Sequence, residues 1–314
     1  MLITASARTA VLMKYTNLFA TMATSFATSS RNECALPETK QLYRLLKRQQ
    51  VSPDSCLLKF ALPPAGRTYL GWEANIPTCI SVCYSGTDEK GEPKVLAKSY
   101  SPISHPATSE TFDLLVKEYN LRPGGGVGAY LCGLQEGDDI KAKVKSQRIM
   151  HGSPEVARRW KHVGLVAGGT GIAPLFQIVK ILLDDPEDAT KIHVLSINRH
   201  ETDILLKDEL DQLTKDYPDR LSVTYALTGA SQPKNGYECG PCDVEMVSKA
   251  LPPPSPEGDT MIFVCGRDGF VSTWGGAVCR APPQPDGSKG PKIQGPLLGV
   301  LKEAGYDASQ VFKY

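Results

Sequence analysis

The sequence of 314 residues predicts an antiparallel β-barrel followed by a doubly wound α/β domain with a parallel sheet. Two observations predict this order. Residues 41–144 contain short candidate strands whose connections are rich in Pro and Gly, a spacing typical of an antiparallel barrel or sandwich. Residues 162–265 instead alternate buried strands with helical patterns, which is typical of a parallel sheet. The length suits two domains.

In the first part of the chain, apolar, aromatic and β-branched residues mark five strands. We expect these strands at residues 56–60, 79–84, 95–100, 112–119 and 139–144. Prolines and glycines in the connections, such as Pro63-Pro64, end the strands. We place this β domain at residues 36–153, after an N-terminal leader of residues 1–35, and end it at the turn Gly152-Ser153-Pro154.

In the second part, residues 154–314, apolar runs predict strands, and apolar residues at helical spacing predict helices. The expected strands are residues 163–167, 191–197, 221–227 and 261–265, and the expected helices are residues 175–183, 203–215 and 243–251. Pro174 suits the first turn of its helix. Ligands bind beyond the carboxyl ends of parallel strands, so we expect residues 168–171, 198–203 and 265–266 to surround one crevice.

The turn Gly168-Gly169-Thr170-Gly171 joins the first of these strands to its helix. Glycines let the backbone turn tightly and approach a ligand, and the free N–H groups of a helix N-terminus attract anions. The turn therefore favours a phosphate site. An ordinary tight turn between strand and helix has the same composition, so both interpretations stay open on this motif alone.

The overall composition excludes several classes of protein. A formal net charge of +1 does not suit nucleic-acid binding, which requires a strongly basic face. The nine cysteines are an odd number in a chain long enough to have its own core, so we expect no disulfide framework. Their spacing does not match a zinc site, and no metal is predicted.

One cysteine pair has the spacing of a thioredoxin-type redox motif, Cys239-Gly240-Pro241-Cys242. That motif requires a preceding strand in a thioredoxin-like context, whereas here it follows the polar residues 230–238. We therefore interpret the pair as part of a turn before a short helix.

The first 32 residues contain no acidic residue and ten Ser or Thr, together with Arg8, Lys14 and Arg31. This composition is typical of a transit peptide and predicts a mitochondrial location. A disordered leader of a cytoplasmic protein and a membrane anchor are the alternatives, and association with a membrane would then occur through this N-terminus.

Six segments, taken in this order, resemble the NADH–cytochrome b5 reductase family of the ferredoxin–NADP reductase superfamily. They are residues 98–104, 112–119, 125–131, 168–174, 198–206 and 264–266. The resemblance covers residues 42–314, and the C-terminal residues 294–314 are similar to a protist or fungal branch. It implies a flavin-binding barrel and a nicotinamide-binding α/β domain.

The resemblance implies FAD as the resident cofactor, with FMN as an alternative, and NADH as the electron donor. It assigns cofactor binding to eighteen residues: Lys98, Tyr100, Ser101, Pro102, Val116, Lys117, Tyr119, Gly125, Gly126, Val127, Gly128, Gly168, Gly169, Thr170, Gly171, Asp203, Cys265 and Gly266. Ser101 and Cys265 are expected to line the catalytic centre. Hydride then passes directly from nicotinamide to flavin, and the protein supplies alignment.

Four positions depart from the pattern of the family. Lys98 stands where the family has arginine, Gly128 where it has serine, and Ala173 where threonine is common. These changes remove a bidentate guanidinium and hydroxyl groups that could hold a phosphate. Arg267 begins a continuation of Cys265-Gly266 that lacks the proline run of the family.

Asp203 matches the acid that favours NADH in the family, because a carboxylate accepts from ribose hydroxyls and repels a 2′-phosphate. It is also a candidate N-cap of the helix at residues 203–215. The resemblance implies that electrons pass from NADH through FAD to a one-electron haem acceptor such as cytochrome b5. An NADPH- or quinone-directed reductase, which Arg199 leaves open, and a flavin-less partner-binding scaffold are the alternatives.

Overall fold

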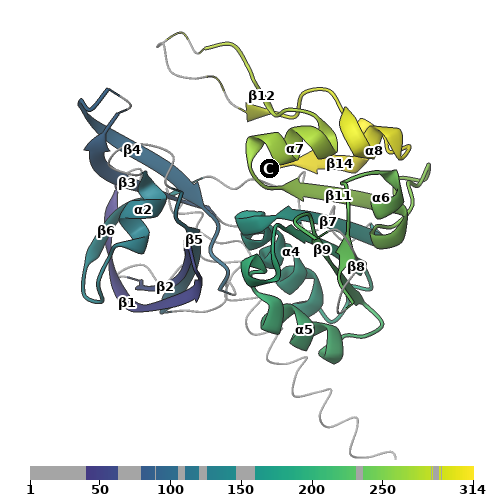
Figure 1. Ribbon diagram of the computed structural model, residues 1–314, viewed down its shortest axis with the longest axis horizontal. Coiled ribbons are helices and arrows are strands. Elements are labelled where there is room, and N and C mark those ends of the chain that lie inside the picture. The colour runs from purple at the N-terminus through teal and green to yellow at the C-terminus, as the bar shows by residue number, and fades with distance from the viewer. Residues whose placement is uncertain are drawn as a thin grey trace, which may run out of the picture. The chain divides into compact units, whose positions relative to one another are not determined.

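The computed structural model describes residues 40–62, 79–88, 90–104, 110–119, 126–145, 160–230, 236–283, 285, 290 and 292–314. Three predictions lie outside these residues: the leader at residues 1–35, the domain boundary at residues 152–154, and Gly125 as a cofactor-binding residue. Figure 1 shows the described elements.

The first sheet has six antiparallel strands in the order β4-β3-β6-β1-β2-β5. The strands are β1 (Gln41–Ser52), β2 (Ser55–Ala61), β3 (Cys79–Thr87), β4 (Pro93–Tyr100), β5 (Thr111–Lys117) and β6 (Asp139–Lys145). Their alternate side chains form one buried core that includes Phe60 and Phe112, which stack 5.4 Å apart. The short helix α2 (Val127–Cys132) packs against β5 and β3 and adds Leu131 to this core.

Five of these strands were expected from the sequence, and β1 was not. The β1 strand buries Tyr43 and Leu45 but exposes Leu42 and Leu46, and a register shift after Leu45 interrupts its alternation. A strand with apolar residues on both faces and a bulge does not show the period of two that indicates a strand. The α2 helix was also missed, because it follows a run of glycines.

The second sheet has six parallel strands in the order β10-β9-β8-β7-β11-β14. The strands are β7 (His162–Gly168), β8 (Lys191–Asn198), β9 (Leu221–Leu227), β10 (Glu238–Cys239), β11 (Thr260–Cys265) and β14 (Val311–Lys313). From β7 the chain adds β8, β9 and β10 on one side and then returns to add β11 and β14 on the other. The point where this order reverses lies between β7 and β11, and such points are where α/β sheets bind ligands.

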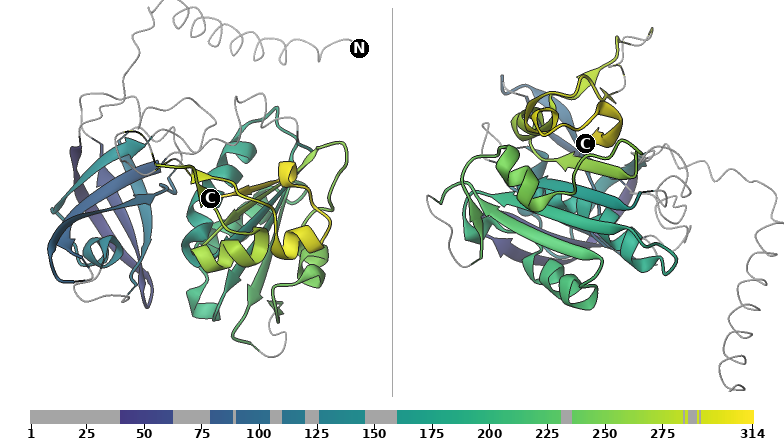
Figure 2. Two further views of the ribbon diagram at one scale, coloured as in Figure 1. Left: turned by 90° about the horizontal axis from the view of Figure 1, so that it is seen from above. Right: turned by 90° about the vertical axis from the view of Figure 1, so that its right-hand side faces the viewer.

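Helices cover both faces of this parallel sheet (Figures 1 and 2). One face packs against α4 (Ile172–Asp184) and α5 (Lys207–Asp216), and the other against α6 (Val244–Ala250), α7 (Asp268–Gly275) and α8 (Gly299–Glu303). Successive residues of β7 divide between the two cores, since Leu165 joins the first and Val166 the second. The fold confirms the predicted barrel followed by a doubly wound α/β domain.

The helix predicted at residues 203–215 begins later than expected, at Lys207. Residues Glu201–Asp203 form a separate 3-10 turn, in which the Asp203 carboxylate accepts from the backbone N–H of His200. Ile204 is then extended, Ile204 and Leu205 are buried, and Leu206 adopts the left-handed φ of 57° before α5 starts. The apolar pattern had suggested Asp203 as the N-cap of α5. The N-cap is instead Leu206.

Candidate functional site

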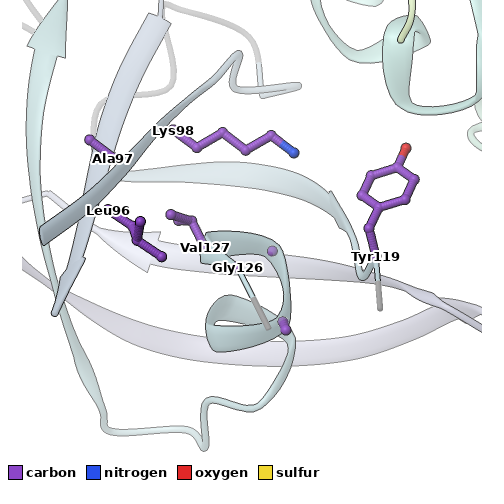
Figure 3. Close-up of a pocket in the computed structure, with 8 residues that line it drawn as sticks. Leu96, Ala97, Lys98, Tyr119, Gly126 and Val127 are labelled. Atoms are coloured by element: carbon purple, nitrogen blue, oxygen red, sulfur yellow. The ribbon is translucent and has the colours of Figure 1, made fainter. Parts of the chain in front are cut away.

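A cavity of about 220 Å³ lies against the barrel, beside β4 and the start of α2. Its lining consists of Leu96, Ala97, Lys98, Tyr119, Gly126, Val127, Gly128 and Ala129. Figure 3 shows the side chain of Lys98 extending across this space toward the ring of Tyr119. The cavity thus brings together five of the predicted cofactor-binding residues from three separate segments of the chain.

The glycine at position 128 has a packing cause. A Cβ added there would lie 2.7 Å from the backbone oxygen of Lys117, closer than real Cβ atoms approach an oxygen, and 3.7 Å from the hydroxyl of Tyr100. Glycine therefore lets the start of α2 press against the end of β5. A serine at this position would require the backbone to move, so the departure from the family pattern follows from the local geometry.

Tyr100, at the end of β4, carries a buried hydroxyl that has no hydrogen-bond partner among the described residues. Burial raises the pKa of this phenol above its usual value, so the group remains an O–H donor at physiological pH. A buried hydroxyl without a partner costs about 1–3 kcal/mol. The hydroxyl is available to an acceptor atom of a ligand, which is what the predicted flavin would provide.

Two cations lie over the ring of Tyr119. The Lys98 amine is 5.3 Å from the ring centroid, and the guanidinium carbon of Arg267 is also 5.3 Å from it. The same Lys98 amine lies 5.5 Å from the ring of Tyr100. Burial, followed by the positive charge of Arg267, lowers the pKa of Lys98. Arg267 was not predicted as part of this site, since it matches no motif of the family.

The two glycine turns predicted to face the nicotinamide meet at the reversal point of the parallel sheet. Gly169 has a φ of 54°, a left-handed conformation that suits glycine. A Cβ on Gly171 would overlap the backbone oxygen of Cys265 and lie 2.8 Å from the nitrogen of Gly266. The turn after β7, which also contains Gly168 and Thr170, is therefore in backbone contact with the turn after β11.

The aromatic ring of Phe270 covers part of these turns. A Cβ built on Gly168 would lie 2.8 Å from this ring, and one on Gly266 would lie 2.5 Å from it. Both positions require glycine because the ring occupies the space of a side chain. Backbone and one ring are thus closely packed at the carboxyl edge of β7 and β11, the place expected for a dinucleotide.

Lys117 connects the barrel to the turn that carries Asp203. Its amine lies 2.7 Å from the carboxylate of Asp54 and 3.8 Å from that of Asp203. Asp54, in the turn between β1 and β2, was not predicted as part of the site, because nothing in the local sequence distinguishes it from other turn aspartates. The predicted residues Lys117 and Asp203 do come together.

The remaining predicted residues take different positions. The side chain of Val116 is fully buried in the barrel core and not in the cavity, so only its backbone can face a ligand. Pro102 forms a bridge to Leu114, and its backbone oxygen accepts from the amide of Gln177 on α4. Ser101 is partly buried between Tyr100 and Pro102, and Cys265 is partly buried at the end of β11.

Cys239 is the second residue of the two-residue strand β10, and Cys242 lies between this strand and helix α6. The strand was not expected, because residues 230–238 are polar. Burial raises the pKa of the Cys242 thiol, whose neighbour is the indole N–H of Trp274. A raised pKa lowers the thiolate fraction and with it the reactivity of a cysteine.

Two family models match the chain. An oxidoreductase FAD-binding domain matches residues 42–149, and an oxidoreductase NAD-binding domain matches residues 165–274. The chain is 34% identical over 265 residues to NADH-cytochrome b5 reductase 2 of Mycosarcoma maydis, covering 83% of this chain and 68% of that protein. It is 32% identical over 273 residues to an NADH-cytochrome b5 reductase-like protein of Arabidopsis thaliana, covering 87% and 76%.

Among solved structures, the chain is similar to the cytochrome b5 reductase domain of Ulva prolifera nitrate reductase. That comparison has a TM-score of 0.65 at 25% identity and covers 88% of this chain and 98% of the other. The residues in and around the cavity fit a flavin, since Lys98 and Arg267 lie over the ring of Tyr119 and the buried hydroxyl of Tyr100 has no partner among the described residues. The chain belongs to the NADH–cytochrome b5 reductase family and is an FAD- and NAD-binding oxidoreductase.

Proposed function

We propose that this chain passes electrons from NADH through FAD to a one-electron haem protein such as cytochrome b5. The contacts of Lys117 carry the proposal. Its backbone oxygen packs against Gly128 at the flavin cavity, and its amine lies 3.8 Å from Asp203 on the nicotinamide side. One residue therefore adjoins both predicted cofactor sites, an arrangement suited to direct transfer between two bound cofactors.

Bound FAD supplies the chemistry, since it accepts two electrons as hydride and releases them singly. The residues of the chain bind the two cofactors and orient them. The Tyr100 hydroxyl donates to the flavin, and Lys98 balances phosphate charge. The turn at Gly168–Gly171 leaves room for a nicotinamide dinucleotide at the carboxyl edge of β7. Cys265, a small residue at the end of β11, lines this site without acting as a nucleophile.

Asp203 is proposed to select NADH. Its carboxylate already accepts from the backbone N–H of His200, so Asp203→Asn keeps this hydrogen bond and removes only the charge. Without the charge, repulsion of a 2′-phosphate is lost, and we expect the ratio of kcat/KM for NADH over NADPH to fall about 10-fold. Steady-state kinetics with both donors measure the ratio. Asp208→Asn, on the exposed first turn of α5, is the control. An unchanged ratio in Asp203→Asn would leave this residue with a structural role only.

The function as a whole is tested by the visible absorbance of the purified protein under anaerobic conditions. We expect a flavin spectrum that bleaches on addition of NADH and recovers on addition of oxidised cytochrome b5. The acceptor is then compared with a quinone in stopped-flow measurements. A protein that retains no flavin after addition of FAD would rule out the proposal. Bleaching that only a quinone reverses would favour the quinone reductase alternative.

An NADPH-directed reductase is the second candidate. Arg199 lies in the same turn as Asp203, four residues before it, and its side chain is exposed. A free guanidinium there can pair with a 2′-phosphate. The donor comparison described above separates the two candidates, because the NADPH-directed enzyme would prefer NADPH before any substitution is made.

We also propose that residues 1–35 direct the chain to mitochondria, because residues 1–32 contain no acidic residue and are rich in Ser and Thr. Within the part of the chain that the structure describes, no helix has the length and apolar character needed to cross a membrane. Fusing residues 1–35 to a fluorescent protein tests the proposal. Uniform cytoplasmic fluorescence would contradict it, and fluorescence on other membranes would favour an anchor.

A further inference from the structure

Two positive side chains from different parts of the chain converge on one aromatic ring. Lys98 comes from β4 of the barrel, and Arg267 is the residue immediately before α7 in the α/β domain. Each lies 5.3 Å from the centroid of the Tyr119 ring. Like charges this close repel each other, and the charge of Arg267 contributes to the lowered pKa of Lys98.

Among the described residues, neither cation has a carboxylate to neutralise it. Within the described residues, no carboxylate lies at ion-pair distance from Lys98 or Arg267, whereas the neighbouring Lys117 pairs with Asp54 at 2.7 Å. The ring of Tyr119 offsets only part of the charge, since a cation–π contact at an exposed site contributes about 0.5–1 kcal/mol. Two unpaired positive charges at the edge of a cavity indicate an anion of comparable charge.

The position of the pair indicates which anion. Lys98 and Tyr119 line the same cavity as Gly126, Val127 and Gly128, whose backbone is free of bulky side chains. Arg267 immediately follows Gly266 at the carboxyl edge of β11. A diphosphate carries two negative charges, and an arginine presents two parallel N–H donors to its oxygens.

We propose that Arg267, together with Lys98, binds the diphosphate of FAD. The inference rests on the proposed function. It also explains the lysine at position 98. The bidentate guanidinium that the barrel lacks there is supplied from the α/β domain by Arg267, a residue outside the family motif. A diphosphate held in this way would contact both domains.

The experiment compares flavins with and without the diphosphate. Apoprotein is titrated with FAD and with riboflavin, which has no phosphate, and binding is followed by the quenching of flavin fluorescence. In Arg267→Ala we expect the Kd for FAD to rise at least about 10-fold, as for loss of a charge-assisted pair, with the Kd for riboflavin unchanged. Arg267→Lys should restore part of the affinity. Lys302→Ala, an exposed cation on α8, is the control and should bind both flavins normally.

A second arm uses inorganic pyrophosphate, which should compete with FAD in the wild type and at least about 10-fold more weakly in Arg267→Ala. An Arg267→Ala variant that binds FAD as tightly as the wild type would overturn this inference but leave the proposed function standing. Equal loss of FAD and riboflavin binding would also overturn it, by indicating a structural effect. If Arg267→Ala bound FAD normally but bound NAD⁺ or the haem acceptor more weakly, the inference would be overturned as well. Wild-type protein that binds neither flavin would instead contradict the proposed function.

Discussion

Replacing Gly171 by alanine is expected to lower the free energy of unfolding by about 3 kcal/mol, the upper end of the usual range for overpacking. Gly171 has an ordinary right-handed φ of −59°, so alanine could adopt its conformation. The cost arises from space, because the new Cβ would overlap the backbone oxygen of Cys265. That oxygen belongs to the end of a central strand, which cannot move without disturbing its pairing with β7.

Urea denaturation followed by circular dichroism measures this loss. The matched control is Gly269→Ala in α7, where an added Cβ meets no atom within 4 Å. Alanine is the better helix former, so the control is expected to gain about 0.5–1 kcal/mol. Equal stability of Gly171→Ala and wild type would mean that the two turns are not in contact.

Lys313→Met is expected to destabilise the fold by about 3 kcal/mol, because one buried and three part-buried backbone carbonyl groups lose their donor. Lys313 is on β14 and is only 3% exposed. Its amine donates to the backbone oxygens of Gly275 at 3.1 Å and Pro296 at 2.9 Å, and lies 3.4 Å from those of Ala277 and Gly295. One cation thus fastens the end of α7 and the segment before α8 to the sheet.

The same lysine gives the stability a dependence on pH. Burial lowers the pKa of Lys313 below the value of 10.5 expected for an unfolded chain. Between these two pKa values the unfolded chain binds more protons, so the contribution of Lys313 makes the wild type more stable as the pH rises. The Lys313→Met variant should lack this gain in the free energy of unfolding at higher pH. Urea denaturation at neutral pH and near pH 10 measures both effects, with Lys302→Met as the exposed control. A variant as stable as wild type at neutral pH would show that the carbonyl groups find other partners.

The sequence was sufficient for the parts of the fold that repeat a simple pattern. The strands β7, β8, β9 and β11 are short apolar runs bounded by turns, and their order with the helices predicts a parallel sheet. The last strand, β14, was not predicted, because three residues are too few to show a period. Its place beside β11 depends on pairing between residues about 50 positions apart.

The residues of the candidate site also fall into those that the sequence could predict and those that it could not. Glycines at positions 128 and 171 could be found as a motif, but the atoms that exclude a side chain at each belong to distant segments. Asp203 was expected at the start of α5, which begins only at Lys207, because the three buried apolar residues after it continue a helical period although Ile204 is extended and Leu206 is left-handed. Arg267 could not be assigned at all, since its role depends on a ring that lies more than a hundred residues away in sequence.

The two cations at Tyr119, which have no ion-pair partner among the described residues, also affect how long the protein persists in a cell. Their repulsion weakens the flavin-free form, and a ligand present at 100 times its Kd adds about 2.7 kcal/mol to the stability of the folded chain. Proteases degrade the unfolded fraction, so a difference of this size changes abundance several-fold. We therefore expect a cell short of riboflavin to contain less of this protein, because the flavin-free chain is degraded faster.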